Sequence, residues 1–366
     1  MNLPAPLRPR AASARPGIPL WISTSLDPAE NLAAEECLLR GTAPDEWRLL
    51  AYRNRPCAIV GRNQNPWTEC APECWRPTAR VPVFRRVSAG GAVVHDPGNA
   101  NLTLIGPRSA YDPGRHTRWL LTLIESWGAP NPIEDERHSI FCGGRKVSGS
   151  AFMLTGSRAL QHATLLLDAD LARIRRCLEP GLDGVETRAQ PSHRVQVRNL
   201  CELRPGVGWA DFLDALIGLL RTAFAAAGRS VMPREFAPET LPGIHDFLDR
   251  YRSWEWRFGR TPPFSVPVRL KLSQTGEFRQ ARLLVRRGRV SGIERAECTP
   301  APEWLQDLQA RLEGRCFDPS ALAAAAHAGN CGPLGTLYFR RAGRWCEFRS
   351  RISGGAGRRS PVAKPL

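Results

Sequence analysis

Lysine is nearly absent from this strongly basic sequence of 366 residues. Only three of its 51 basic residues are lysines, namely Lys146, Lys271 and Lys364, and all the others are arginines. The ammonium of lysine and the planar guanidinium of arginine are not interchangeable at a binding site, so each remaining lysine is a candidate functional residue. Lys364 lies in a terminal segment rich in Gly, Pro and Arg, and Lys271 lies in an alternating run that predicts a strand. Lys146 lies in a sequence motif, the segment GRKVSGSA at residues 144–151.

Metal-binding and disulfide patterns are also missing. The eleven cysteines include no CxxC pair and no Cys/His spacing of the zinc type, so the sequence predicts no metal site. An odd number of scattered cysteines favours a reducing compartment and buried, unpaired thiols. No apolar run reaches the length of a membrane-spanning helix, and we expect no membrane association. With 42% hydrophobic residues, the chain still has enough apolar surface for an extensive core.

Acidic residues are absent before Asp27. Residues 1–18 carry Arg8, Arg10 and Arg15, and an acid-free, arginine-bearing start is typical of a mitochondrial presequence. Prolines at positions 4, 6 and 9 weaken the helix that such a signal needs, so a basic disordered tail is the alternative. We expect residues 1–19 to be a transit peptide or tail and the protein to be in the mitochondrial matrix, or in the cytoplasm if the chain is bacterial. Residues 349–366 are expected to be a second disordered tail.

The net charge of +16 points to a polyanionic ligand or an acidic partner. A nucleic acid is one such ligand, but aromatic residues are not interleaved with the basic ones in any known reader motif. A basic face suits acidic protein domains equally well. We therefore expect an acidic protein partner and no nucleic acid.

Periodicity and turn signals predict alternating helices and strands. Helices are expected over about 28–40, 115–127, 171–178, 209–227, 302–312 and 319–328. Strands are expected as a pair within 47–60, as one strand over 161–167 and as a meander over 264–296. The intervening segment 179–194 is rich in Pro and Gly and long enough to be a functional loop.

Residues 84–104 contain a run of small residues between two apolar runs. This pattern predicts two strands joined around a glycine turn. Gly90 and Gly91 lack Cβ atoms, so a ligand can approach their backbone and their N–H groups can face an anion. Arg85 and Arg86 precede the turn, where a guanidinium can bind phosphate or carboxylate as a fork. The alternative interpretation is an ordinary hairpin with a solvated basic flank.

A second strand–turn–strand unit is predicted over residues 138–151. The glycine pair 143–144 turns the chain, and the following residues alternate. Because side chains two residues apart point to the same side of a strand, Lys146, Ser148 and Ser150 are expected to share one face.

Five sequence blocks in order resemble the lipoate–protein ligases and the related mitochondrial lipoyltransferases. They are residues 27–36 (DPAENLAAEE), 61–69 (GRNQNPWTE), 85–99 with the glycine turn and His-Asp, 144–151 (GRKVSGSA) and 162–167 (HATLLL). Residues 253–256 (SWEW) and 261–265 (TPPFS) resemble the accessory domain of that family. The resemblance covers roughly residues 20–320, and an ordered set of blocks is far more specific than one glycine pair.

The resemblance implies an α/β (α+β) fold. Its catalytic domain, expected over 20–245, has a mixed, mostly antiparallel sheet flanked by helices and is akin to biotin ligases and class II synthetases. A small α+β accessory domain is expected over 246–348, and the protein is expected to be a monomer.

The family's reaction has two steps. The lipoate carboxylate attacks the α-phosphate of ATP in the presence of Mg²⁺, giving lipoyl-AMP, and an acceptor lysine then attacks the mixed anhydride. The acceptors are lipoyl domains of 2-oxoacid dehydrogenase E2 subunits and the glycine cleavage H protein. Both steps require positive charge and N–H donors beside developing negative oxygens. The small molecules implied are therefore lipoyl-AMP, or lipoate with ATP and Mg²⁺.

The resemblance assigns candidate roles to individual residues. Lys146 is the expected catalytic point charge, Arg86 the phosphate fork and the backbone of Gly90 and Gly91 the cradle. Further residues expected to bind lipoyl-AMP are Ser88, Asn99, Ser148, His162, Arg62 and Asn63. Arg188 and Arg194 belong to the family's adenylate-binding loop, here 179–194, and the apolar strands near Val93 and Leu165 would line the lipoyl tunnel.

Several departures from the family pattern concern the ATP-dependent step. Ala89 replaces a glycine of the turn, Ser139 an aspartate, Met153 an arginine and Arg188 a lysine. The expected activity is therefore lipoyl transfer from lipoyl-AMP, and the alternative is a complete ATP-dependent ligase. A less favoured alternative is an octanoyl or lipoyl transfer through a thioester on Cys142, which we expect to be a packed residue.

Overall fold

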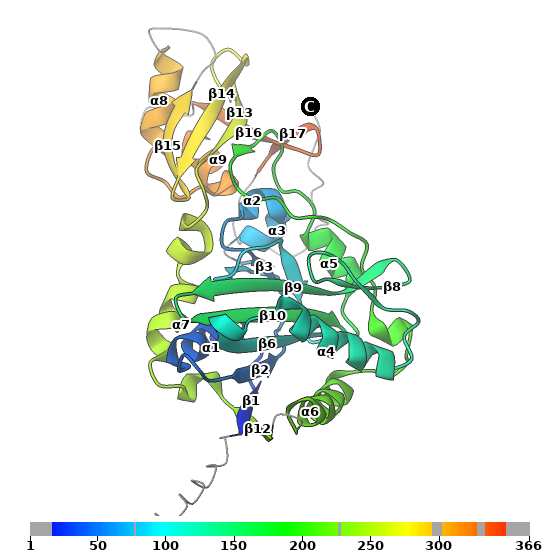
Figure 1. Cartoon of the computed structure of the whole chain (residues 1–366). Coiled ribbons are helices and arrows are strands. Elements are labelled where there is room, and N and C mark those ends of the chain that lie inside the picture. Colours follow the sequence, from blue (N-terminus) through cyan, green and yellow to red (C-terminus); the bar gives the residue numbers. More distant parts are fainter. Residues whose placement is uncertain (1–16, 77, 226–227, 295–301, 328–333, 349–366) are drawn as a thin grey trace, which may run out of the picture.

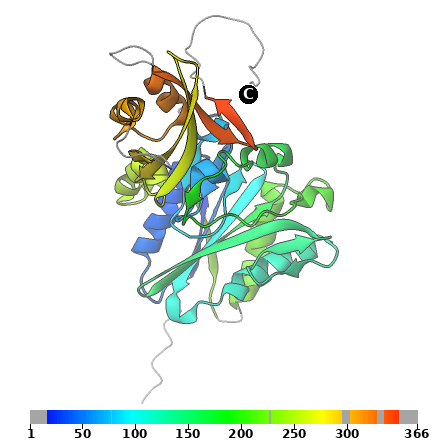
Figure 2. The same ribbon diagram turned by 90° about the horizontal axis from the view of Figure 1, so that it is seen from above.

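The computed structural model describes residues 17–76, 78–225, 228–294, 302–327 and 334–348. It contains an eight-stranded sheet, a three-stranded sheet and a six-stranded sheet in the C-terminal part. In Figure 1 the C-terminal sheet lies above the large sheet, and Figure 2 looks down on the molecule from that end. No helix of the described ranges is long and apolar enough to cross a membrane.

The eight-stranded sheet is mixed and mostly antiparallel, as predicted. In spatial order its strands are β12 (Val231–Phe236), β1 (Ile18–Ser23), β2 (Arg48–Tyr52), β6 (Asn99–Pro107), β10 (Arg158–Leu166), β9 (Arg145–Thr155), β8 (Ile140–Cys142) and β7 (Ile133–Glu134). Only β1 makes parallel pairs, with β12 and β2. Because β1 begins at Ile18, the last residues of the predicted 1–19 tail belong to the sheet, while residues 1–16 and 349–366 lie outside the described residues.

Helices cover both faces of this sheet, and Figure 1 shows one pair on each side. The pairs are α1 (Pro28–Gly41) with α7 (Ile244–Arg252), and α4 (Pro113–Ser126) with α6 (Trp209–Ala225). Asp27 caps α1 by accepting hydrogen bonds from two backbone N–H groups of its first turn. Buried leucines of each pair pack on opposite faces of the central strands, which places two hydrophobic cores around one sheet.

The predicted pairing of two strands within residues 47–60 is wrong. β2 joins the large sheet, whereas β3 (Cys57–Val60) is the centre of the three-stranded sheet, between β4 (Val83–Arg85) and β5 (Val93–His95). β3 alternates between two cores, since Ala58 and Val60 face one and Cys57 and Ile59 face the other. A strand that is buried on both faces carries no pattern that identifies its neighbours.

The prediction of a hairpin around the glycine turn within residues 84–104 is also wrong. β4 and β5 do not pair with each other, because β3 lies between them and pairs with β4 in parallel and with β5 antiparallel. Residues 86–92, which we call the glycine loop, therefore form a wide connection across the end of β3 and not a tight turn. The unit over 138–151 is confirmed: β8 and β9 are antiparallel, and Gly143 and Gly144 both have positive φ.

The C-terminal part is a second α+β unit. Its strands are β15 (Arg289–Glu294), β14 (Phe278–Arg286), β13 (Phe264–Leu272), β16 (Gly335–Arg341) and β17 (Arg344–Glu347), with β11 (Glu186–Thr187) paired to β13 and with α8 (Glu303–Leu312) and α9 (Pro319–His327) alongside. The meander and both helices agree with the prediction. The domain division at residue 246 stays a prediction, since α7 packs on α1 and the second sheet begins only at Phe264.

Short elements complete the described chain. They are α2 (Pro66–Glu69), α3 (Pro72–Trp75), α5 (Leu171–Cys177), the 3-10 turns η1 (Arg108–Ala110), η2 (Leu200–Glu202) and η3 (Pro238–Thr240), and the π-helical turn η4 (Glu255–Gly259). Arg85 connects η4 to the start of α2. Its buried guanidinium donates to the carbonyls of Gly61, Gln64 and Arg257 and to the hydroxyl of Thr261, so it is a structural brace and not a ligand fork.

Candidate active site

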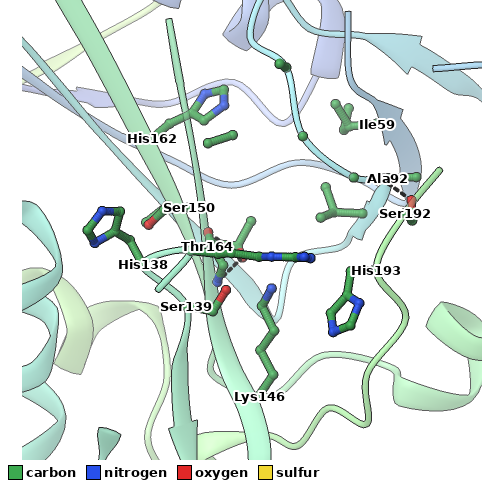
Figure 3. Close-up of a pocket in the computed structure, with 18 of the residues that line it drawn as sticks. Ile59, Ala92, His138, Ser139, Lys146, Ser150, His162, Thr164, Ser192 and His193 are labelled. Carbon is green, nitrogen blue, oxygen red and sulfur yellow. Dashed lines mark hydrogen bonds between the residues drawn. The ribbon is translucent and has the colours of Figure 1, made fainter. Parts of the chain in front are cut away.

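A cavity of about 760 Å³ lies between the large sheet, the three-stranded sheet and two connecting segments. Its walls are formed by residues 89–93 of the glycine loop and β5, residues 149–152 of β9, and the segments 135–139 and 190–193. Arg86, Lys146 and His162 also line it, as predicted. In Figure 3, Lys146 extends from its strand into the space between His138 and His193.

The backbone of Lys146 is held on both sides. β8 pairs with it along one edge, and on the other edge its N–H donates to the carbonyl of Gln196 at 2.9 Å while its carbonyl accepts from the N–H of Arg198 at 3.0 Å. No described residue forms a hydrogen bond or ion pair with its Nζ. Burial lowers the pKa of Lys146, against the opposing charge of Asp135. The site thus presents a partly desolvated ammonium that is free to contact an anion.

A β-bulge changes which residues accompany Lys146. Phe141 pairs with Lys146 and Ile140 pairs with Ser148, so Val147 is an extra residue on β9. Val147 and Ser148 are both buried, and Gly149 takes the cavity-facing position that strict alternation would give to Ser148. The prediction of one face for Lys146, Ser148 and Ser150 is therefore wrong, and Ser148 does not line the cavity.

Arg86 supports the glycine loop from inside. Its Nε donates to Ser88 Oγ at 2.9 Å, and its Nη2 donates to the carbonyls of Ala89 at 2.7 Å and Gly91 at 2.9 Å. A loop that turns widely exposes carbonyls to the interior, and a buried guanidinium satisfies several of them at once. Burial lowers the pKa of Arg86 to about 10, well above neutral pH. Most N–H groups of Arg86 therefore donate to the glycine loop and are not available to bind a phosphate, contrary to the expectation from the sequence.

Gly90 permits this arrangement. Its φ of +94° is in the region that favours glycine, and a Cβ there would lie 3.0 Å from Arg86 Nη2. Gly90 and Gly91 both line the cavity, as expected for a cradle.

His162 is part of a buried polar chain that the sequence did not reveal. Its Nδ1 lies 2.9 Å from Glu35 Oε1, and its Nε2 lies 2.8 Å from Ser88 Oγ. Glu35 is fully buried on α1 and also accepts from the hydroxyl of Thr103. Burial alone would raise the pKa of Glu35, but the charge and hydrogen bond of His162 bring it below its usual value. A carboxylate in the apolar stripe of a predicted helix, four residues before Leu39, was the available signal.

Segment 190–195 crosses the cavity and is attached by Ser192. Its Oγ accepts from the N–H of Ala92 at 2.8 Å and from Gln64 Nε2 at 2.9 Å, and it donates to the carboxylate of Glu69. Gln64 in turn accepts from the N–H of Gly61 at 2.9 Å. Sequence reasoning named none of these side chains as site residues, although Gln64 and Glu69 lie in one of the family blocks.

Replacing Ser192 by alanine is expected to loosen this segment. The change removes the three hydrogen bonds of the Ser192 hydroxyl, each of about 1 kcal/mol, and leaves the carboxylate of Glu69 with only the backbone N–H of residue 192 as a donor, at 3.3 Å. Trypsin should then cleave after Arg188 and Arg194 several-fold faster than in the wild type, and Ser291→Ala on β15 provides a matched control. Cleavage rates equal to the wild type would show that Ser192 does not hold the segment.

Several predicted site residues lie elsewhere. Asn99 is buried and donates to Asn101, which lines the cavity in its place. Arg62 and Asn63 are exposed, and they take part through their backbones: both carbonyls accept, from Arg85 and from the N–H of Gln190, and the N–H of Arg62 donates to the carbonyl of Ser88.

Other residues that were predicted to belong to the site lie near the cavity without lining it. Ser88 is a buried residue of the glycine loop that does not line the cavity, and neither Arg194 on the crossing segment nor Arg188 just before it lines the cavity. Leu165 faces the core below α4 and α6, while Val93 does line the cavity. Cys142 is fully buried outside the cavity, and burial raises the pKa of its thiol, which argues against a thioester there.

The cavity has chemically distinct parts. Leu32, Ile59 and Val93 contribute apolar surface, whereas Lys146 and Arg137 contribute cationic surface. Figure 3 shows Ile59 near the glycine loop and Lys146 at the opposite side of the space. Such a cavity accommodates an anion that carries an apolar chain. Fold and cavity together define an α/β protein with a binding site between its large mixed sheet and the three-stranded sheet.

The comparison with family models is more specific. The model described as "Lipoyl protein ligase A/B catalytic domain" matches residues 27–221, more than half of the chain, and the chain belongs to this family. It is therefore an enzyme of protein lipoylation, as the sequence blocks suggested.

Solved structures share the fold. LipL1 of P. falciparum, solved with lipoate, has a TM-score of 0.58 and 22% identity over 76% of this chain and 84% of that chain. The bi-partite lipoate protein ligase of Thermoplasma acidophilum has a TM-score of 0.53 and 21% identity over 66% of this chain and 96% of that chain. A lipoate-protein ligase A bound with ATP has a TM-score of 0.53 and 21% identity, over 66% and 98% of the two chains.

Proposed function

We propose that this enzyme transfers a lipoyl group from lipoyl-AMP to a lysine of a protein acceptor domain. The observation that carries the proposal is the position of Lys146, whose ammonium has no described partner and faces the cavity across from the glycine loop. A cation at this place can contact both the acyl carbonyl and the phosphate of a mixed anhydride. The apolar surface of Leu32, Ile59 and Val93 suits the lipoyl chain.

The transfer step needs little more than positioning and charge. The acceptor amine attacks the carbonyl carbon, the C–N bond forms, and the C–O bond to the phosphate breaks with its electron pair leaving on AMP. One amine proton is released to water. Negative charge develops on the carbonyl oxygen and on the leaving phosphate, and Lys146 would stabilise it where bulk water is largely excluded.

The ATP-dependent step has less support in this chain. Arg86 directs most of its N–H groups at the glycine loop, and Ala89 and Ser139 depart from the ligase pattern near the cavity. Relatives bear on both steps: one was solved with lipoate and another with ATP. We therefore rank transfer from lipoyl-AMP first and the complete ligase second.

Acceptors are proposed to be lipoyl domains of E2 subunits and the glycine cleavage H protein. The Thermoplasma ligase was studied with its E2 lipoyl domain, and a net charge of +16 favours acidic acceptor domains here. We further propose that the enzyme acts in the mitochondrial matrix, on the basis of the basic residues 1–18. A fluorescent reporter fused behind residues 1–30 that remains in the cytosol of a eukaryotic cell would contradict this location.

One comparison separates the two activities. The apo acceptor domain is incubated with lipoyl-AMP, and separately with lipoate, ATP and Mg²⁺, and its mass is measured over time. We expect modification from lipoyl-AMP and at least 100-fold slower modification from lipoate and ATP. Equal rates would establish the complete ligase, and no modification from either mixture would overturn the proposed function.

A further inference from the structure

The ammonium of Lys146 lies directly over Gly149 on the same strand. A Cβ atom built at Gly149 would be 2.8 Å from Lys146 Cε and 2.9 Å from its Nζ, so the end of the lysine side chain would have to move away from any side chain at 149. The φ of Gly149 is outside the left-handed region, so its backbone conformation is one that alanine can adopt. The requirement for glycine therefore comes from Lys146 and not from the backbone.

The bulge at Val147 creates this contact. In a regular strand, residues 146 and 149 would point to opposite faces, but the extra residue brings both to the cavity side. Thr164 on β10 then fixes the position of Gly149, because its Oγ1 accepts from the N–H of Gly149 at 3.3 Å and donates to its carbonyl at 3.4 Å. The surface under the lysine is thus a backbone segment held from two sides.

We propose that Gly149 is a positioning residue that sets the location of the Lys146 ammonium in the cavity. The bare backbone at 149 leaves a shallow depression, and the lysine chain lies in it with its Nζ directed at the substrate space. Any side chain at 149 displaces the ammonium by about 1 Å, the shift that brings these contacts to an ordinary van der Waals separation. The inference rests on the proposed function for its catalytic consequence, but the contact itself can be tested separately.

The scarcity of lysine makes a direct test possible. With only three lysines in the chain, ¹³Cε-labelled lysine gives three NMR signals, and the Lys146 signal is the one that Lys146→Arg removes. We expect Gly149→Ala to shift this signal and to raise the pKa of Lys146 toward its ordinary value, because the displaced ammonium is better solvated. Gly156→Ala is the matched control, since a Cβ there meets nothing within 4 Å. An unmoved Lys146 signal in Gly149→Ala, or an equal movement in Gly156→Ala, would overturn the inference.

Kinetics provide the second measurement. A displacement of about 1 Å in a positioned group costs up to about 100-fold, so Gly149→Ala should lower kcat for acceptor modification about 10–100-fold. KM for lipoyl-AMP should change less than about threefold, because the rest of the cavity is untouched. In a Lys146→Ala background, Gly149→Ala should have no further effect on the remaining rate.

The two measurements separate failure of the inference from failure of the proposed function. A wild-type enzyme without transferase activity, together with a shifted Lys146 signal in Gly149→Ala, would leave the contact valid and remove the proposed function. An additive kinetic effect in the Lys146→Ala background would show that Gly149 acts through something other than the lysine. If Gly149→Ala fails to fold in both backgrounds, strand packing explains the glycine and the inference is wrong.

Discussion

Replacement of Lys146 by arginine is expected to lower lipoyl transfer from lipoyl-AMP at least about 100-fold without unfolding the protein. Removing one preorganised donor from a water-poor site typically costs about 10²–10³ in kcat. Arginine keeps the positive charge, but its guanidinium is planar and larger than an ammonium, and the end of the Lys146 side chain lies close against the backbone of Gly149. The measurement is acceptor modification by mass spectrometry under single-turnover conditions, together with thermal unfolding.

A matched control is available because the chain has so few lysines. Lys271 on β13 lies over the ring of Phe278 in the C-terminal sheet, far along the chain from the cavity. Lys271→Arg should leave transfer within about twofold of the wild type. Near-normal transfer by Lys146→Arg would show that charge alone suffices and that Lys146 has no specific role in the reaction.

The parts of the fold that depend on local pattern could be predicted from the sequence. α1 has an Asp cap followed by Pro at its first position, and the C-terminal meander has turns between alternating strands, so both are apparent without tertiary information. Strand partners are a different matter. β2 and β3 are short and buried on both faces, so the residues that make them strands do not indicate which strands they join.

In the candidate site, too, some features could be predicted from the sequence and others depend on tertiary structure. Lys146, Gly90, Gly91 and His162 line the cavity, and each belongs to a sequence block that carries the family resemblance. The direction of the Arg86 guanidinium depends on carbonyls that become buried only when the glycine loop closes around it. Such hydrogen-bond demands arise in the folded chain and leave no trace in local sequence patterns.

The bulge at Val147 is the second feature beyond the reach of pattern reading. One extra residue exchanges the faces of every side chain that follows it, so Gly149 replaces Ser148 beside the lysine. Side chains along β9 do alternate between two faces, as the sequence predicts. Which of them face the cavity is decided by the bulged pairing of β9 with β8. Family blocks identified the strand correctly and could not supply this register.

Loss of the Glu35 carboxylate is expected to have the largest effect on stability. Glu35→Ala leaves His162, Thr103 and the buried cation of Arg86 without their acceptor or counter-charge, and breaking a buried pair in this way typically costs about 3–5 kcal/mol. Glu35→Gln keeps the shape and a carbonyl acceptor and should cost less. Urea denaturation at pH 7 measures both, and Glu125→Gln, at an exposed position on α4, should stay within about 0.5 kcal/mol of the wild type.

The pH dependence distinguishes charge from shape in this network. The folded-state pKa of Glu35 is below its ordinary value, so the unfolded chain binds the proton more tightly than the folded one. The stability that ionised Glu35 contributes is therefore fully present above the unfolded-state pKa of about 4.3, and it is lost as the pH falls through the lower folded-state pKa. The difference in stability between wild type and Glu35→Gln should consequently be constant from pH 6 to 7 and shrink below about pH 4. A difference that persists unchanged into that acidic range would mean that the carboxylate acts by its shape and hydrogen bonds and that its charge adds nothing to the stability of the fold.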